Sequence, residues 1–110
     1  MNEFDPSDEE PCGDFPPPAP GALVADIPII NKKGLHARAS AKFVHTVEQF
    51  EAEVRVSRCG ETVGGDSIMG LMMLSAGPGT SIRVEAKGTD AQAVLDALIA
   101  LVGDRFGEEE

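Results

Sequence analysis

The chain has 110 residues, of which 42% are apolar, a size and composition that suit one domain with a modest core. Its net charge of −10 lies at the ends, because residues 1–26 hold seven acids and no Lys or Arg, residues 108–110 add three acids, and residues 27–107 carry nine charges of each sign. This distribution excludes nucleic acid as a main partner, since phosphate contacts require a basic surface. No apolar run approaches the ~20 residues that cross a bilayer, and the N-terminus lacks the features of a signal peptide, so we expect a cytoplasmic protein without a membrane partner.

Residues 1–22 form an acidic, proline-rich extension that we predict to be disordered. The first 20 residues contain six prolines and six acids, and this composition cannot bury enough apolar area to offset the chain entropy. A proline-rich docking segment is the alternative interpretation. We expect one folded domain over residues 23–107 and a short acidic tail over residues 108–110.

The first half of this domain is predicted to contain a strand, a helix and a hairpin. Residues 23–30 are apolar and β-branched and end at a turn-forming sequence, as is typical of a strand. Residues 37–49 have helical periodicity. Alternation over residues 52–57, followed by a turn at Cys59-Gly60, predicts a hairpin with a weak strand near residues 62–63. The apolar stripe of the helix is expected to consist of Ala37, Ala41, Phe43, Val44 and Val47.

The second half is predicted to contain a short helix, a strand and a longer helix. Ser67 precedes an apolar run over residues 68–74, which suits two helical turns. Residues 82–87 alternate as a strand that is covered on one face, and Thr89 with Gln92 predicts a capping box for a last helix ending near Gly103. The order β-α-β-β-α-β-α therefore predicts an α+β open-faced sandwich, with a four-stranded antiparallel sheet and three helices on one face.

His36 lies between the turn at residues 33–34 and the predicted first helix, beside the unpaired N–H groups of the first helical turn. These donors and the helix dipole favour an anion and disfavour a charged imidazole, so we expect a neutral, nucleophilic ring. Arg38 adds planar donors that match phosphate oxygens. Gly34, the N–H of Ala37 and Arg38 would thus form a phosphate cradle around His36. The alternative is that His36 is an ordinary N-cap and Arg38 a solvated charge.

Two strings of the sequence resemble the signatures of one family. GLHARAS at residues 34–40 resembles the phosphorylation-site signature of HPr, the histidine phosphocarrier of the bacterial phosphotransferase system, and DSIMGLM at residues 66–72 resembles the second HPr signature, around a regulatory serine. The likeness extends over about residues 23–107. Ala39 stands where the family commonly has proline, which would leave the first helical turn less preorganised.

The resemblance implies a stoichiometric phosphoryl carrier that is not an enzyme and needs no cofactor. Enzyme I, charged by phosphoenolpyruvate, would pass a phosphoryl group to the Nδ1 atom of His36, and His36 would pass it to an enzyme IIA-type acceptor. The partner would complete the in-line geometry. A monomer is the default for such a shuttling protein. Sugar uptake and the nitrogen-type regulatory branch both remain open as its destination.

The short second helix has more apolar side chains than one buried stripe can hide. By analogy with the family, we predict that Ile68, Met69 and Met72 form an exposed docking surface, the alternative being that all of them lie in the core. Ser67 is expected to cap this helix. The resemblance implies that an HPr kinase/phosphorylase modifies Ser67, which would place close to two negative charges beside the docking surface and impede transfer at His36.

The remaining histidine and the cysteines are assigned no chemistry. His45 is expected to be solvated, and a metal site joining His36, His45, Cys12 and Cys59 has no supporting spacing, so no metal is expected. Cys12 and Cys59 are expected to be free thiols. Two other functions stay open, namely an HPr-like regulatory module that acts by docking alone and a ferredoxin-like sensor of a small ligand.

Overall fold

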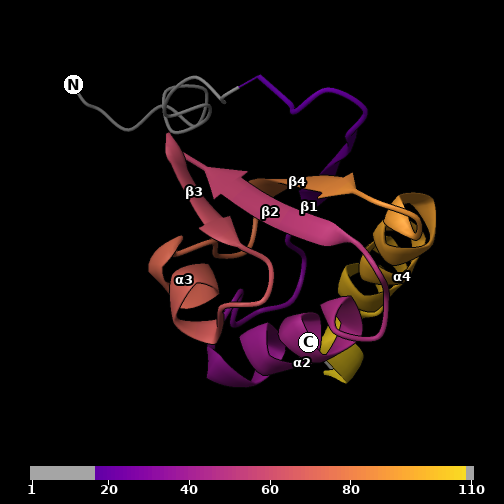
Figure 1. The fold of residues 1–110 in the computed structure, drawn as a ribbon. Coiled ribbons are helices and arrows are strands. Elements are labelled where there is room, and N and C mark those ends of the chain that lie inside the picture. The colour runs from indigo at the N-terminus through magenta and orange to yellow at the C-terminus, as the bar shows by residue number, and fades with distance from the viewer. Residues whose placement is uncertain (1–16, 109–110) are drawn as a thin grey trace.

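The structure is a computed structural model that describes residues 17–108. Four strands form one antiparallel sheet in the order β1-β4-β2-β3, and the three helices lie together on one of its faces (Figure 1). This arrangement confirms the predicted open-faced α+β sandwich. No helix of residues 17–108 is long and apolar enough to span a bilayer. The elements are β1 (Leu23–Pro28), α2 (Ala37–Val47), β2 (Glu53–Arg58), β3 (Glu61–Gly64), α3 (Ile68–Met73), β4 (Ser81–Lys87), α4 (Ala91–Gly103) and a 3-10 turn, η1 (Arg105–Gly107).

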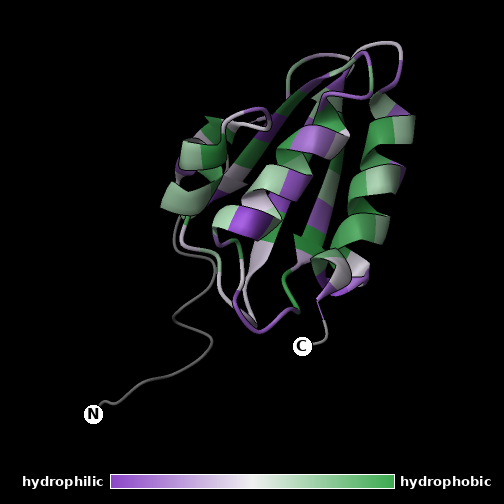
Figure 2. Ribbon diagram, turned by 90° about the horizontal axis from the view of Figure 1, so that it is seen from below, coloured by the Kyte–Doolittle hydropathy of each residue, from purple (hydrophilic) through white to green (hydrophobic). Residues whose placement is uncertain are grey.

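The core lies between the sheet and the helix layer. In the central strand β4, Ile82, Val84 and Ala86 are buried, while the intervening Arg83 and Glu85 lie toward the open face. Such alternation follows from the period of two of a strand, and it confirms the prediction of a strand covered on one face. Figure 2 shows the helices side by side, with α2 in the middle, and α2 packs against both α3 and α4.

Helix α2 confirms the predicted helix but presents a different stripe to the core. Ala39 and Ser40 are buried together with residues 43, 44 and 47, whereas Ala37 and Ala41 are exposed, so the prediction was wrong for these two alanines. The buried positions follow the i, i+3, i+4 spacing of one helical face, and residues 37 and 41 lie outside it. As a result, the start of α2 presents Ala37 and Arg38 to solvent.

The predicted capping box of α4 does not form. The N-cap is Asp90 and no side chain caps this helix end. The Asp90 carboxylate instead accepts a hydrogen bond from the N–H of Glu51 (2.8 Å), and Gln92 donates to Asp96 one turn along the helix (2.9 Å). A contact with a residue 39 positions away therefore takes the place of the local cap, and Asp90 ties α4 to the segment before β2.

The hairpin turn is formed by Cys59 and Gly60, both in the left-handed region with φ of 54° and 80°. Two consecutive positive φ values are typical of a type I′ turn, which confirms the predicted hairpin. Cys59 is disulfide-bonded, so the prediction of a free thiol was wrong for this residue. Proximity in the fold, which sequence spacing does not reveal, decides whether a disulfide forms. Cys12 lies outside the described residues.

Residues 17–22 belong to the extension that the sequence predicts to be disordered. In the structure the N–H of Ala22 donates to the carbonyl oxygen of Ala19 (3.0 Å), closing a turn before β1. The N–H of Ala19 donates to a carboxylate oxygen of Glu85 on the open face of the sheet (3.0 Å). The second contact connects the chain just before β1 to the inner strand β4.

Candidate functional site

The loop before α2 is shaped by a close approach to the segment that follows α3. The N–H of Leu35 donates to the carbonyl oxygen of Ala76 (2.9 Å). Gly34 has φ +65°, and a Cβ on this residue would lie 2.3 Å from that same oxygen, so only glycine fits here. The N–H of Gly34 donates to the carbonyl oxygen of Asn31 (3.2 Å). Gly34 thus sets the path of the loop, while its own donor is already used.

His36 occupies the N-cap of α2, but its ring does not cap the helix. Its backbone is extended (φ −80°, ψ −177°), and its side chain makes no cap hydrogen bond. The first helical bond runs from the N–H of Ser40 to the carbonyl oxygen of His36 (2.8 Å), so the N–H groups of residues 37–39 have no acceptor within residues 17–108. The first turn also lacks an acidic residue. Three N–H donors and the positive end of the helix dipole therefore lie at the base of the imidazole.

The imidazole of His36 meets a carboxylate from the other end of the domain. Its Nε2 atom contacts Oε2 of Glu108, and the second carboxylate oxygen accepts from Nδ2 of Asn31 (3.0 Å). The Asn31 amide is buried and also donates to the carbonyl oxygen of Gly34 (2.9 Å). Asn31 therefore links the Glu108 carboxylate to the loop that carries His36.

The charge of Glu108 determines which ring nitrogen is available. Burial raises the pKa of this carboxyl, but the hydrogen bonds from His36 and Asn31 and the positive charges of His36 and Lys33 outweigh burial, so its pKa lies below the usual value. A carboxylate only accepts hydrogen bonds, and the Nε2 atom of His36 must therefore carry the proton. In the neutral form of the ring, Nδ1 then holds the lone pair. With 28% of the His36 side chain exposed, the ring is accessible from solvent.

Arg38 extends into solvent from the first turn of α2 and lines an open hollow of about 360 Å³ beside α2 and α4. No hydrogen bond joins the Arg38 guanidinium to His36 in the structure. Lys42 and His45 line the same hollow, and His45 is exposed as predicted. The Nζ of Lys42 donates to the carbonyl oxygen of Phe106 (2.5 Å). The exposed side of α2 thus carries cationic groups next to the three N–H donors.

Helix α3 presents apolar side chains to solvent. Met69 is 72% exposed and Ile68, Met72 and Met73 are also exposed, whereas Leu71 is fully buried. The alternative that all of these residues lie in the core is therefore wrong. Ser67 is the N-cap, as predicted, and its Oγ accepts from the N–H of Gly70 (3.0 Å).

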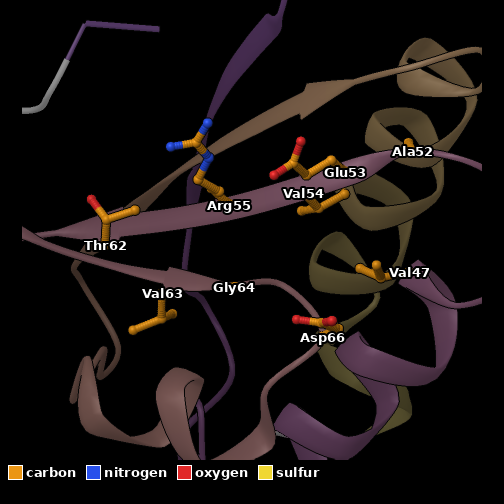
Figure 3. Close-up of a pocket in the computed structure, with 9 residues that line it drawn as sticks. All are labelled: Val47, Ala52, Glu53, Val54, Arg55, Thr62, Val63, Gly64 and Asp66. Atoms are coloured by element: carbon orange, nitrogen blue, oxygen red, sulfur yellow. The ribbon is translucent and has the colours of Figure 1, made fainter. Parts of the chain in front are cut away.

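A second hollow, of about 460 Å³, lies where β3 ends, between β2, the loop after β3 and the end of α2. Figure 3 shows Arg55 on one side of the sheet and Val63 on the other, and Asp66 in the loop that follows β3. This hollow contains none of the predicted site residues. It is lined by Val47, Ala52, Glu53, Val54, Arg55, Thr62, Val63, Gly64 and Asp66.

The residues around His36 can hold a small anion against a nitrogen nucleophile. In the neutral ring Nδ1 offers a lone pair, and the N–H groups of residues 37–39 and the side chain of Arg38 belong to the same end of α2. Within residues 17–108 no group of three His, Cys, Asp or Glu side chains is placed to hold a metal ion. The arrangement therefore suits the acceptance of a phosphoryl group by nitrogen, with donors for its oxygens.

Comparison with known proteins places this site in a family. Residues 24–104 match the family model PTS-HPr, described as the PTS HPr component phosphorylation site. The chain belongs to the HPr family. It is 51% identical over 88 residues to the phosphocarrier protein HPr of Cupriavidus necator, covering 80% of this chain and 99% of that protein. It is also 41% identical over 86 residues to the phosphocarrier protein NPr of Shewanella violacea, covering 78% and 94% of the two chains.

The HPr fold is shared as well. The crystal structure of HPr-C-His from Thermoanaerobacter tengcongensis superposes with a TM-score of 0.76 at 38% identity, covering 80% of this chain and 99% of that one. Membership of the HPr family supports a phosphocarrier function within the phosphotransferase system. The matched range includes His36 and Ser67 but ends before Glu108.

Two residues beside His36 escaped the sequence-based interpretation. The sequence after residue 30 predicts only a turn, although the side chain of Asn31 in that turn links Gly34 to Glu108. The composition of residues 108–110 predicts only an acidic tail, although Glu108 contacts the imidazole. Composition identified the charge of the tail, but no local pattern indicates that the chain returns to a residue 72 positions earlier.

Proposed function

We propose that the Nδ1 atom of His36 accepts a phosphoryl group from phosphorylated enzyme I and passes it to enzyme IIA-type acceptors. The observation that carries this proposal is the contact between Nε2 and the Glu108 carboxylate, because in the neutral ring it leaves the lone pair on Nδ1 at the start of α2. The protein acts as a stoichiometric carrier and not as an enzyme. It works as a cytoplasmic monomer, since it has to meet a donor and several acceptors in turn.

The transfer is an in-line exchange of one bond to phosphorus for another. The lone pair of Nδ1 forms the new N–P bond while the bond between phosphorus and the histidine nitrogen of the donor breaks, and its electron pair stays with the donor. Passing the group to an acceptor histidine or cysteine reverses these roles. His36 keeps its Nε2 proton throughout, so neither step requires a proton transfer at this residue.

The first turn of α2 supplies donors for the phosphoryl oxygens. The N–H groups of Ala37, Arg38 and Ala39 have no acceptor among residues 17–108, and Arg38 adds a guanidinium with a planar set of N–H groups. Gly34 contributes by holding the loop against Ala76. Removing one such donor from a reacting oxygen typically costs about 10² in rate, so we expect Arg38→Ala to slow transfer by this order.

The exposed side chains of α3, namely Ile68, Met69 and Met72, provide the docking surface in this proposal. They are apolar and adaptable, which suits a carrier that binds several partners. Helix α3 packs against α2. A phosphate placed on Ser67 by an HPr kinase/phosphorylase would bring negative charge to the edge of this surface and slow transfer at His36.

The test is incubation of the full chain with enzyme I and phosphoenolpyruvate, followed by intact mass measurement and stability assays of the phosphate. We expect one acid-labile, alkali-stable phosphate on the wild type and none on His36→Ala. His45→Ala is the matched control, because it removes the other, exposed histidine and should be labelled fully. Labelling that persists in His36→Ala, or a wild type that accepts no phosphate, would reject the proposal. A wild type that binds enzyme I without being labelled would instead indicate a module that acts by docking alone.

A further inference from the structure

The chain just before β1 lies against the face of the sheet that points away from the helices, the open face (Figure 1). The N–H of Ala19 donates to the Glu85 carboxylate on this face (3.0 Å). The Glu85 side chain is only 15% exposed, although no helix of residues 17–108 covers it. Part of the extension before β1 is therefore fixed to the open face.

The turn between β2 and β3 lies at the end of the sheet toward which this extension is directed. The N–H of Ala22 donates to the carbonyl oxygen of Ala19, closing a turn that reverses the chain before it enters β1. The residues before Ala19 are therefore directed along the open face, toward the end of β1 at Pro28. Strands β1 and β2 both pair antiparallel with β4, so they run the same way, and Cys59, just after β2, lies at that same end.

Cys59 is disulfide-bonded, and the sequence contains one other cysteine, Cys12. A disulfide within one chain therefore joins Cys12 to Cys59. Because Arg55 is paired with Glu85, the turn at Cys59 lies four residues along β2 from the level of the Glu85 contact. That separation is about 13 Å along the strand, and neighbouring strands are about 5 Å apart.

The segment of residues 12–18 has the length for this path. It has seven residues, of which Pro16, Pro17 and Pro18 favour the extended polyproline conformation. Seven residues in this conformation span about 22 Å. This exceeds the separation along β2 and across one strand, and the remainder accommodates the disulfide and the height above the sheet. The segment therefore reaches Cys59 across the open face with little excess length.

We propose that residues 12–18 form a strap over the open face of the sheet, which the disulfide between Cys12 and Cys59 holds in place and which a thiol releases. The occupant of this face is thus a segment of the same chain. Asp14, in the strap, has a cation to meet on β2, because the Arg55 side chain is 48% exposed and approaches Glu85 only to 4.0 Å. The inference goes beyond the carrier function and does not depend on it.

The disulfide makes the strap sensitive to redox conditions. The bond forms when Cys12 and Cys59 together give up two protons and two electrons to a small disulfide, such as oxidised glutathione, which becomes two thiols. The reverse exchange, which starts with attack of a thiolate on the bond, opens the strap. Cys59 is partly exposed, so a small thiol has access to it. Disulfides of cytoplasmic proteins are commonly transient, and reduction would release the acidic, proline-rich residues 1–18.

The first test asks whether the bond forms within one chain. The full chain is treated with oxidised glutathione or with dithiothreitol at low protein concentration, and is analysed by intact mass and non-reducing peptide mapping. We expect an oxidised monomer that is lighter by two hydrogen atoms, with a cross-linked peptide pair containing Cys12 and Cys59, and no such pair in Cys12→Ser. A disulfide-linked dimer, or a chain that carries glutathione on both cysteines, would reject the strap.

The second test asks whether the bonded segment lies on the open face. Amide hydrogen exchange and ¹⁵N spectra are recorded for the oxidised and the reduced wild type. We expect the amide of Ala19 to exchange about 10-fold more slowly in the oxidised chain, and the shifts that change on reduction to lie in the hairpin and around Arg55 and Glu85, not in α2. Cys12→Ser is the matched control, because serine is similar in size but forms no bond, and it should give the reduced pattern under both conditions.

The outcomes are distinguishable from those of the carrier proposal. If the disulfide forms but Ala19 exchange and the open-face shifts are the same in both redox states, the bond holds no strap on the sheet and the inference is wrong. Labelling of His36 by enzyme I should be equal in the two states, since α2 and α3 lie on the other face. A label that forms only in the reduced chain would place the segment over the helices and overturn the inference. A wild type that is labelled in neither state would reject the carrier function alone.

Discussion

The start of α2 and the helix α3 are neighbours in the helix layer, but they are built in opposite ways. At the start of α2, contacts from distant parts of the chain set the geometry, because Ala76 holds Leu35 and Glu108 holds His36. In α3, a local cap at Ser67 and exposed apolar side chains define the surface. Bond exchange requires atoms held to a fraction of an ångström, whereas docking requires only an accessible apolar face. We expect the two regions to respond differently to substitution.

The largest effect should come from within α3 itself, at its buried residue. Leu71 is fully buried, and Leu71→Ala should lower the free energy of unfolding by about 2–5 kcal/mol through lost transfer energy and a cavity. Met69→Ala, two residues earlier and largely exposed, should change it by less than about 0.5 kcal/mol. Denaturant unfolding measures both. Equal losses in the two variants would show that α3 has no distinct exposed face.

Gly34→Ala should damage the start of α2 more than any other loop substitution near it. A residue with a β-carbon loses about 1–2 kcal/mol of stability in a left-handed backbone conformation, and the close contact of this carbon with the Ala76 carbonyl oxygen adds to the loss. The free energy of unfolding should fall, and so should the rate at which the small phosphoryl donor phosphoramidate phosphorylates His36. Gly77→Ala is the matched control, because a Cβ there meets nothing within 4 Å. A stable, reactive Gly34→Ala variant would contradict the described loop.

Met69→Glu should separate recognition from chemistry. We expect the apparent affinity for enzyme I to fall by about 10-fold, which corresponds to about 1.4 kcal/mol, because a charge replaces an apolar contact. The phosphoramidate rate and the unfolding free energy should remain those of the wild type, since Met69 is exposed. Glu61→Gln, on the exposed hairpin, serves as a control for surface charge. Normal transfer kinetics in Met69→Glu would remove Met69 from the docking surface.

The smallest effect concerns the open face of the sheet, which lies outside both regions. On the open face of the sheet, the hydrogen bond from Arg83 lowers the pKa of Asp26, and burial opposes this shift only in part. The stabilisation is therefore present above the ordinary pKa of an aspartate and is lost as the pH falls through the lowered value. Because Asp26 is exposed and Arg83 is only partly buried, Asp26→Asn should cost only about 0.2–0.5 kcal/mol at neutral pH. Unfolding measured from pH 7 downward should show this difference vanish in acid.

Local periodicity predicted most of the fold. The alternation of Ile82, Val84 and Ala86 indicated the face of β4, and the turn at Cys59-Gly60 indicated the hairpin. The failures occurred where a distant residue competes with a local one. Thr89 resembled a cap, but Asp90 accepts from Glu51 instead. The stripe of α2 was misassigned because alanine fits both a buried and an exposed face.

In the candidate site, too, the features set by neighbouring residues were predicted and those set by distant residues were not. The N-cap position of His36 and the free N–H groups after it follow from the sequence around residue 36, as does the cap at Ser67. The contact of Glu108 with His36 depends on the left-handed turn at Phe106, a conformation that side chains rarely adopt and that no residue type in the tail indicates. Local chemistry was therefore predictable, and its long-range support was not.

The turn at Phe106 determines which of the residues after it reaches the imidazole of His36. An extended residue spans about 3.3–3.6 Å, more than the length of a hydrogen bond. Inserting or deleting a single residue between Phe106 and Glu108 would move the carboxylate out of register with the imidazole while leaving the composition of the tail almost unchanged. The single residue Gly107 between Phe106 and Glu108 thus sets the reach of the carboxylate through chain length rather than through charge.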